Sequence, residues 1–124
     1  MFTRVLVATD GSDTATRAVD RAVEVALAHG ATLTVLAAGE PATAQAVVDA
    51  ELERLAASQL AVDSLVVAGD AAAAIVDSAE AGAFDLVVVG NKGMTGPRRR
   101  FTLGSVPNKV SHSLGCSLLI VRTT

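Results

Sequence analysis

The sequence predicts an α/β fold in which one parallel β-sheet is covered by helices on both faces. Five short runs of β-branched and other apolar residues recur along the chain, as is typical of strands buried on both faces. Longer segments with apolar residues at helical spacing separate these runs, which favours repeated βα units. With 124 residues, 51% of them hydrophobic, the chain is expected to form a single domain over residues 1–124.

The first half of the chain predicts two strands and two helices. Residues 4–9 form an apolar, β-branched run that the turn-prone residues 10–13 follow. Apolar residues at helical spacing then extend from Ala15 to Leu27, and Gly30 is expected to end this helix. Residues 32–37 predict the second strand. The second helix is marked by apolar positions between Ala44 and Leu60, and its polar side is expected to carry Glu51, Glu53, Arg54 and Ser58.

The second half predicts three more strands and two more helices. Asp70 is the expected N-cap of a helix that ends near Gly82. A glycine-rich stretch precedes the last helix, which Ser105 is expected to cap and which tolerates Pro107 in its first turn. The three strands are expected at residues 62–68, 85–90 and 117–121.

The composition excludes several classes of protein. No apolar run approaches the roughly 18 residues that a membrane span needs, and the first residues lack the pattern of a signal peptide. The lone Cys116 excludes an internal disulfide, so a reducing cytoplasm is expected. A net charge of −3 argues against general binding of nucleic acid.

The charges are unevenly distributed along the chain. All 13 acidic residues lie within residues 1–85, whereas residues 86–124 hold none. Six basic residues lie in this second segment: Lys92, Arg98, Arg99, Arg100, Lys109 and Arg122. The segment is therefore either a solvated basic loop or a surface that meets an anion.

Two loops after predicted strands have compositions that suit a phosphorylated ligand. In an open α/β sheet, ligands bind beyond the carboxyl ends of the strands, where the strand order reverses. One such loop holds residues 9–12; the other runs from Gly90 through Gly93 to Gly104 and Ser105. Glycines let backbone N–H groups approach a phosphate, and a helix start adds free N–H groups and the positive end of its dipole. Together these features predict a phosphate site.

Simpler readings of the same residues stay open. Gly90 alone suits a strand-end turn, and Gly104 with Ser105 suits an ordinary helix cap. Asp10 could instead form an Asx-turn or cap the first helix. A calcium loop at residues 10–13 is disfavoured because the glutamate that such loops require is absent. Hydrolases with an aspartate after the first strand use an Asp-x-Asp motif, which this chain lacks.

The glycine pattern after the fourth strand resembles the phosphate-binding signature of the nucleotide-binding branch of the universal stress protein family. The pattern consists of Gly90, Gly93 and, after a loop, Gly104-Ser105. Residues 5–12, Gly69-Asp70 and residues 116–121 are similar too, so the resemblance covers the whole chain. It implies a flavodoxin-like (adenine-nucleotide α-hydrolase-like) sandwich with strand order 3-2-1-4-5 and ATP in the cleft between the first and fourth strands. It also implies a stress-response role and a homodimer through the last strand.

The resemblance assigns roles to individual positions. It places adenosine against Thr9 and Asp10, adenine against Ala37, ribose against Val89 and Gly90, and phosphates against Gly93, Gly104, Ser105 and Val106. Two departures from the family pattern affect the phosphate end. The loop between Gly93 and Gly104 is one residue longer than in the signature, and Pro107 stands where the family often has a polar residue.

Three functions are compatible with these residues. The first is a regulatory protein that binds an adenine nucleotide (ATP, AMP or cyclic AMP), because the phosphate cradle has no evident general base or nucleophile. The second is a slow ATPase or phosphotransferase in which Asp10 holds Mg²⁺ on the phosphates. The third is a ligand-free protein–protein module of the same fold, which the retained glycines disfavour.

Overall fold

The computed structural model describes residues 1–91 and 103–123. Its strands are β1 (Arg4–Ala8), β2 (Thr32–Ala38), β3 (Val62–Val67), β4 (Leu86–Gly90) and β5 (Ser117–Val121). Its helices are α1 (Asp13–His29), α2 (Pro41–Arg54), α3 (Ala71–Ala81) and α4 (Ser105–Ser113). All the predicted strands and helices are therefore present.

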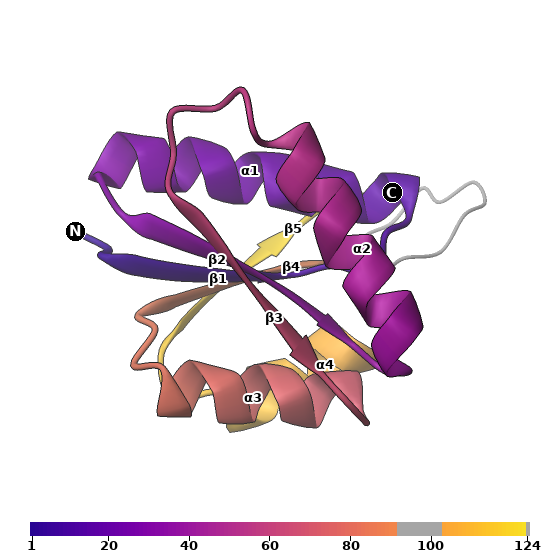
Figure 1. Ribbon diagram of the computed structural model, residues 1–124. Helices are drawn as coiled ribbons and strands as arrows, with labels where there is room; N and C mark the ends of the chain where they lie inside the picture. The colour runs from indigo at the N-terminus through magenta and orange to yellow at the C-terminus, as the bar shows by residue number, and fades with distance from the viewer. Residues whose placement is uncertain (92–102, 124) are drawn as a thin grey trace.

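The elements form a three-layer sandwich. The strands are all parallel and stand in the order β3-β2-β1-β4-β5, which confirms the predicted fold class and strand order. Helices α1 and α2 cover one face of the sheet, and α3 and α4 cover the other (Figure 1). No helix in the described part of the chain is long and apolar enough to cross a membrane.

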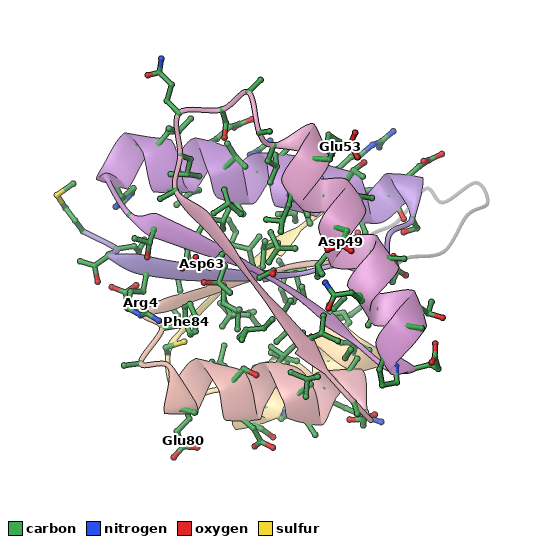
Figure 2. The ribbon with its side chains drawn as sticks, in the orientation of Figure 1. Arg4, Asp49, Glu53, Asp63, Glu80 and Phe84 are labelled. Carbon is green, nitrogen blue, oxygen red and sulfur yellow. The ribbon has the colours of Figure 1, made fainter. Side chains whose placement is uncertain are left out.

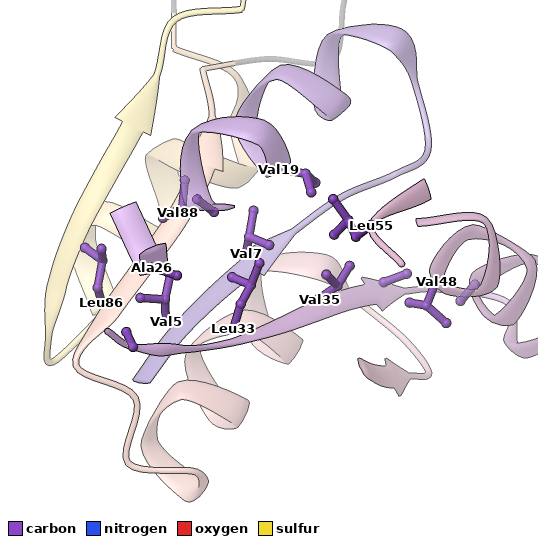
Figure 3. Packing of buried hydrophobic residues seen from close by; sticks show 14 residues of the cluster. Val5, Val7, Val19, Ala26, Leu33, Val35, Val48, Leu55, Leu86 and Val88 are labelled. Atoms are coloured by element: carbon purple, nitrogen blue, oxygen red, sulfur yellow. The ribbon is translucent and has the colours of Figure 1, made fainter. Parts of the chain in front are cut away.

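Each strand contributes side chains to two hydrophobic cores, because successive side chains alternate between the two faces of the sheet. On the α1/α2 face, Val5 and Val7 of β1 pack with Val19 of α1 and Val48 of α2 (Figure 3). Leu6, between the two valines, points to the α3/α4 face and joins the second core. The cores are built mainly from alanine, valine and leucine, which lets the helices lie close to the sheet.

The predicted helix ends follow their caps. Ser12, rather than Asp10, caps α1: its side chain accepts a hydrogen bond from the Ala15 N–H. Asp70 accepts one from the Ala73 N–H at the start of α3, as expected. Helix α1 ends at Gly30, whose φ of 66° lies in the left-handed region that favours glycine.

Helix α2 is displaced from its predicted position. Glu40 caps it, accepting hydrogen bonds from the N–H groups of Ala42 and Thr43, so the helix begins earlier than expected. It ends at Arg54 because the next residues form a turn: the N–H and the hydroxyl of Ser58 both donate to the carbonyl of Leu55, at 3.0 and 2.7 Å. The prediction that this helix extends to Leu60 is wrong.

Glu51 of α2, predicted on the polar side, is buried. Its Oε2 accepts hydrogen bonds from Nε and Nη2 of Arg54 at 2.9 and 2.7 Å. Arg54 also donates to Asp20 Oδ1 of α1 at 2.7 Å. The carboxylate tolerates burial because the guanidinium pairs with it in place of water, and the same guanidinium connects α2 to α1.

The amino end of the sheet is closed by a separate set of contacts. The Asp85 carboxylate accepts hydrogen bonds from the N–H groups of Thr3 and Arg4 and from the Thr3 hydroxyl. The Arg4 guanidinium lies 4.6 Å from the centre of the Phe84 ring (Figure 2). These contacts join β1 to the turn before β4, at the end opposite the predicted site.

Candidate functional site

A cavity of about 170 Å³ lies at the carboxyl ends of the central strands. Because β2 and β4 lie on opposite sides of β1, the strand order reverses between β1 and β4, where ligands bind in open α/β sheets. The residues that line the cavity are Ala8, Thr9, Asp10, Ala15, Leu36, Ala38, Ala71, Ile75, Val89, Gly90, Val106 and Pro107. The lining is mostly apolar, and its polar side chains are those of Thr9 and Asp10.

The structure brings together several of the predicted site residues but not all of them. Five of them line the cavity: Thr9, Asp10, Val89, Gly90 and Val106. Gly104 and Ser105 lie at the start of α4, beside Val106, but do not line it. Gly93 and the basic residues from Lys92 to Arg100 lie outside the described residues.

Ala37, predicted to contact adenine, is not among the residues that line the cavity. Ala37 is 2% exposed and packs in the core on the α1/α2 face. Its neighbours Leu36 and Ala38 line the cavity instead. The shift by one residue exchanges the faces, because successive side chains of a strand point to opposite sides of the sheet.

The loop after β1 is both a turn and a wall of the cavity. Asp10 Oδ1 accepts a hydrogen bond from the Ser12 N–H at 2.9 Å, which is the Asx-turn that the sequence allowed. Thr9 Oγ1 accepts one from the Gly11 N–H at 3.1 Å, and Gly11 has a positive φ of 82°. The turn fixes the backbone of Thr9 and Asp10 where both face the cavity.

The start of α4 differs from the prediction in two ways. Gly104, not Ser105, is the N-cap, and no side chain among the described residues caps this helix. Ser105 is already the first helical residue, so its exposed hydroxyl lies one position too late to cap. The first-turn amides that face outward come from Ser105 and Val106, because Pro107 has no N–H.

The Gly104 amide, predicted to contact phosphate, already has a partner. Its N–H donates to the main-chain carbonyl of Asn91 at 2.7 Å. Asn91, the residue after β4, is fully buried, and the sequence analysis assigned it no role. Its position directly after a buried strand could have indicated one, because a buried asparagine needs hydrogen-bond partners for its side-chain amide.

The electrostatics of the cavity come largely from the backbone. Helices α1, α3 and α4 all begin at this end of the sheet, and Ala15, Ala71 and Val106 of their first turns line the cavity. The positive ends of the three helix dipoles favour an anion there. Asp10 is the only charged residue among the described ones that line the cavity. Within residues 1–91 and 103–123, no group of three or more His, Cys, Asp or Glu side chains could hold a metal ion.

A second cavity, of about 390 Å³, lies between the ends of α3 and α4. Phe84, Leu114 and Cys116 are among the residues that line it. Burial raises the pKa of the Cys116 thiol, and the nearby Asp85 carboxylate raises it further. The thiol is therefore held in its protonated, poorly nucleophilic form.

The fold and the first cavity define a flavodoxin-like α/β domain with a hollow at its switch point. The model of the Universal stress protein family matches residues 1–56 and 38–122. A universal stress protein of Thermus aquaticus is 36% identical over 138 residues, which cover 98% of this chain and all of that protein. The chain belongs to the universal stress protein family.

Solved structures of the family have the same fold. The crystal structure of a universal stress protein in complex with cAMP has a TM-score of 0.84 and 37% sequence identity, over 99% of this chain and 98% of that one. A family protein from Arabidopsis thaliana with AMP bound has a TM-score of 0.77, over 98% of this chain and 92% of that one. At 15% identity, the second comparison shows the fold alone.

Proposed function

We propose that this protein is a regulatory protein of the stress response that binds an adenine nucleotide: ATP, AMP or cyclic AMP. The observation that carries the proposal is the apolar cavity at the switch point, on which three helix starts converge. The relative at 37% identity whose structure is in complex with cAMP supports it. An adenine nucleotide suits such a cavity, because its base would pack against the apolar wall and its phosphate would lie at the helix starts.

The cavity suggests an orientation for the ligand. Leu36, Ala38 and Ile75 offer an apolar wall against which a purine would lie. The N–H groups of Ser105 and Val106 would meet a phosphate, joined by Gly93 and the rest of the glycine-rich loop. Mg²⁺ would accompany a polyphosphate if the carboxylate of Asp10 holds it.

Calorimetric titration with ATP, ADP, AMP and cyclic AMP tests the proposal. We expect a dissociation constant below about 1 mM for at least one of them. Ala71→Leu places a larger side chain in the cavity and should weaken binding at least about tenfold, or about 1.4 kcal/mol. Ala81→Leu, at the exposed far end of the same helix, is the matched control and should bind like the parent chain. Failure of all four nucleotides to bind would exclude the proposed function.

A slow Mg²⁺-dependent ATPase is the second candidate, because Asp10 brings a carboxylate to the cavity. Turnover of ATP that disappears in Asp10→Ala would favour it. ATP that stays intact for hours with the purified protein would reject it.

We propose that the protein forms a homodimer through β5 and works in the cytoplasm. Among the strands that the structure describes, β5 pairs only with β4, and the segment Ser117–Val121 carries no charged side chain. An uncharged edge strand favours pairing across a two-fold axis. Sedimentation velocity should give a dimer at micromolar concentrations; a monomer at all concentrations would contradict this assembly.

A further inference from the structure

One buried side chain closes the base of the glycine-rich loop. Asn91 follows β4 directly and has no exposed surface. Its Oδ1 accepts hydrogen bonds from the Thr123 N–H at 2.7 Å and from the Thr123 hydroxyl at 3.1 Å. Its main-chain N–H donates to the Val121 carbonyl at 2.8 Å, and its carbonyl accepts from the Gly104 N–H at 2.7 Å. Asn91 thus joins the end of β4, the tail after β5 and the start of α4.

The tail is held from its other side as well. Thr123 is 2% exposed, and its carbonyl accepts a hydrogen bond from Arg17 Nη1 of α1 at 3.0 Å. The Thr123 Cγ2 lies only 3.2 Å from the point where a Cβ on Gly90 would stand. The backbone at the end of β4 therefore lies directly against the tail. Such a buried, hydrogen-bonded contact resists displacement, since breaking it would leave buried polar groups without partners.

This contact lies between two walls of the candidate nucleotide cavity. Gly90, the residue before Asn91, lines the cavity from β4, and Val106, two residues after Gly104, lines it from α4. The hydrogen bond between residues 91 and 104 therefore fixes the separation of these two walls. A ligand that must contact both walls binds most tightly when their separation is set in advance.

We propose that Asn91 is a positioning residue for nucleotide binding, which together with Thr123 and Gly104 forms a clasp that sets the distance between the β4 and α4 walls. The inference rests on the proposed function, because it assigns the clasp's effect to that site. The clasp also explains why the Gly104 amide is bonded to protein rather than free for phosphate: it holds the outward-facing amides of Ser105 and Val106 in place.

The test compares nucleotide affinity with local hydrogen exchange in matched variants. Asn91→Ala should weaken binding of cyclic AMP or AMP by at least about tenfold and speed exchange of the Gly104 amide. Thr123→Val, which replaces the hydroxyl with a methyl group, should weaken binding by about threefold, whereas Thr123→Ser, which keeps a hydroxyl, should bind like the parent chain. Asp85→Ala destabilises the opposite end of the sheet and is the control: it should lower stability without changing affinity.

The outcomes separate the two proposals. If the parent chain binds no nucleotide, the proposed function fails, and exchange at Gly104 still decides whether the clasp exists. If the parent chain binds while folded Asn91→Ala binds equally well, the positioning role is overturned. If Asn91→Ala does not fold, the comparison of Thr123→Val with Thr123→Ser tests the positioning role. Equal affinity of the two variants for the nucleotide overturns the proposal, and tighter binding by Thr123→Ser supports it.

Discussion

At the scale of single residues, glycines in this chain differ sharply in what a Cβ atom would meet. A Cβ on Gly82 would stand 2.4 Å from Phe84 Cε2 and 3.2 Å from the Ser78 carbonyl, so the ring would have to move. We expect Gly82→Ala to lower the free energy of unfolding by about 1–3 kcal/mol through overpacking. Gly115→Ala, whose Cβ would meet nothing within 4 Å, should change it by less than about 0.5 kcal/mol. Urea titrations of both variants measure the difference; equal midpoints would contradict it.

At the same scale, the side chains that line the cavity from β2 are hard to identify from the sequence. The segment from Leu33 to Ala37 is buried throughout, so no alternation of polar and apolar residues reveals which face each side chain takes. Only pairing with β1 decides it: Leu36 stands opposite Ala8, and both line the cavity. For this reason the sequence could not show that Leu36 and Ala38, rather than Ala37, line the cavity. The ends of β1 and β4 could be located from their turn residues.

At the scale of elements, Asp85 couples stability to pH. Hydrogen bonds from the N–H groups of Arg4 and Thr3 hold the pKa of Asp85 below its ordinary value of 3.8. A carboxyl whose pKa is lowered by folding stabilises the protein fully above its ordinary pKa, and this contribution is lost as pH falls through the lowered value. Asp85→Asn should therefore lower the free energy of unfolding by about 1 kcal/mol near pH 6, a figure already discounted for solvent exposure, and by progressively less as the pH falls below 3.8. Chemical denaturation of both chains across this range measures it; a pH-independent difference would contradict the account.

The ion pairs of Arg54 link α2 to α1 and give a second prediction at this scale. Arg54→Met leaves the buried Glu51 carboxylate without its partner and should cost about 3 kcal/mol. The double variant with Glu51→Gln should recover part of this loss, because the unpaired charge is gone. Asp20→Asn, at an exposed pair, should cost less than about 1 kcal/mol. Thermal unfolding of the parent chain and the three variants measures these losses of stability. Equal losses for Arg54→Met and Asp20→Asn would contradict the prediction.

Helix α2 also shows which features of an element apolar periodicity cannot predict. Helical spacing located α2, but its end depends on the turn that Ser58 closes on Leu55, and its buried Glu51 depends on an arginine three residues further on. Both are side-chain contacts that apolar periodicity does not register. Where a cap was explicit in the sequence, as at Gly30 and Asp70, the helix ends were predicted correctly.

At the scale of the whole molecule, the alternation of strands and helices was sufficient to predict a parallel sheet, and the family resemblance supplied its order. The position of the cavity followed, since the switch point of a parallel sheet depends on strand order alone. The clasp could not be predicted, because Asn91 and Thr123 are 32 positions apart and meet only once β4 and β5 pair.

An NMR titration with cyclic AMP, AMP and ATP tests most directly whether the cavity at the switch point binds an adenine nucleotide. We predict that the amide signals of Thr9, Gly90 and Val106 shift with at least one nucleotide at concentrations up to about 5 mM, while those of Ala83 and Gly115 at the other end of the sheet do not. No shift with any of the three, or shifts confined to the second cavity, would contradict it.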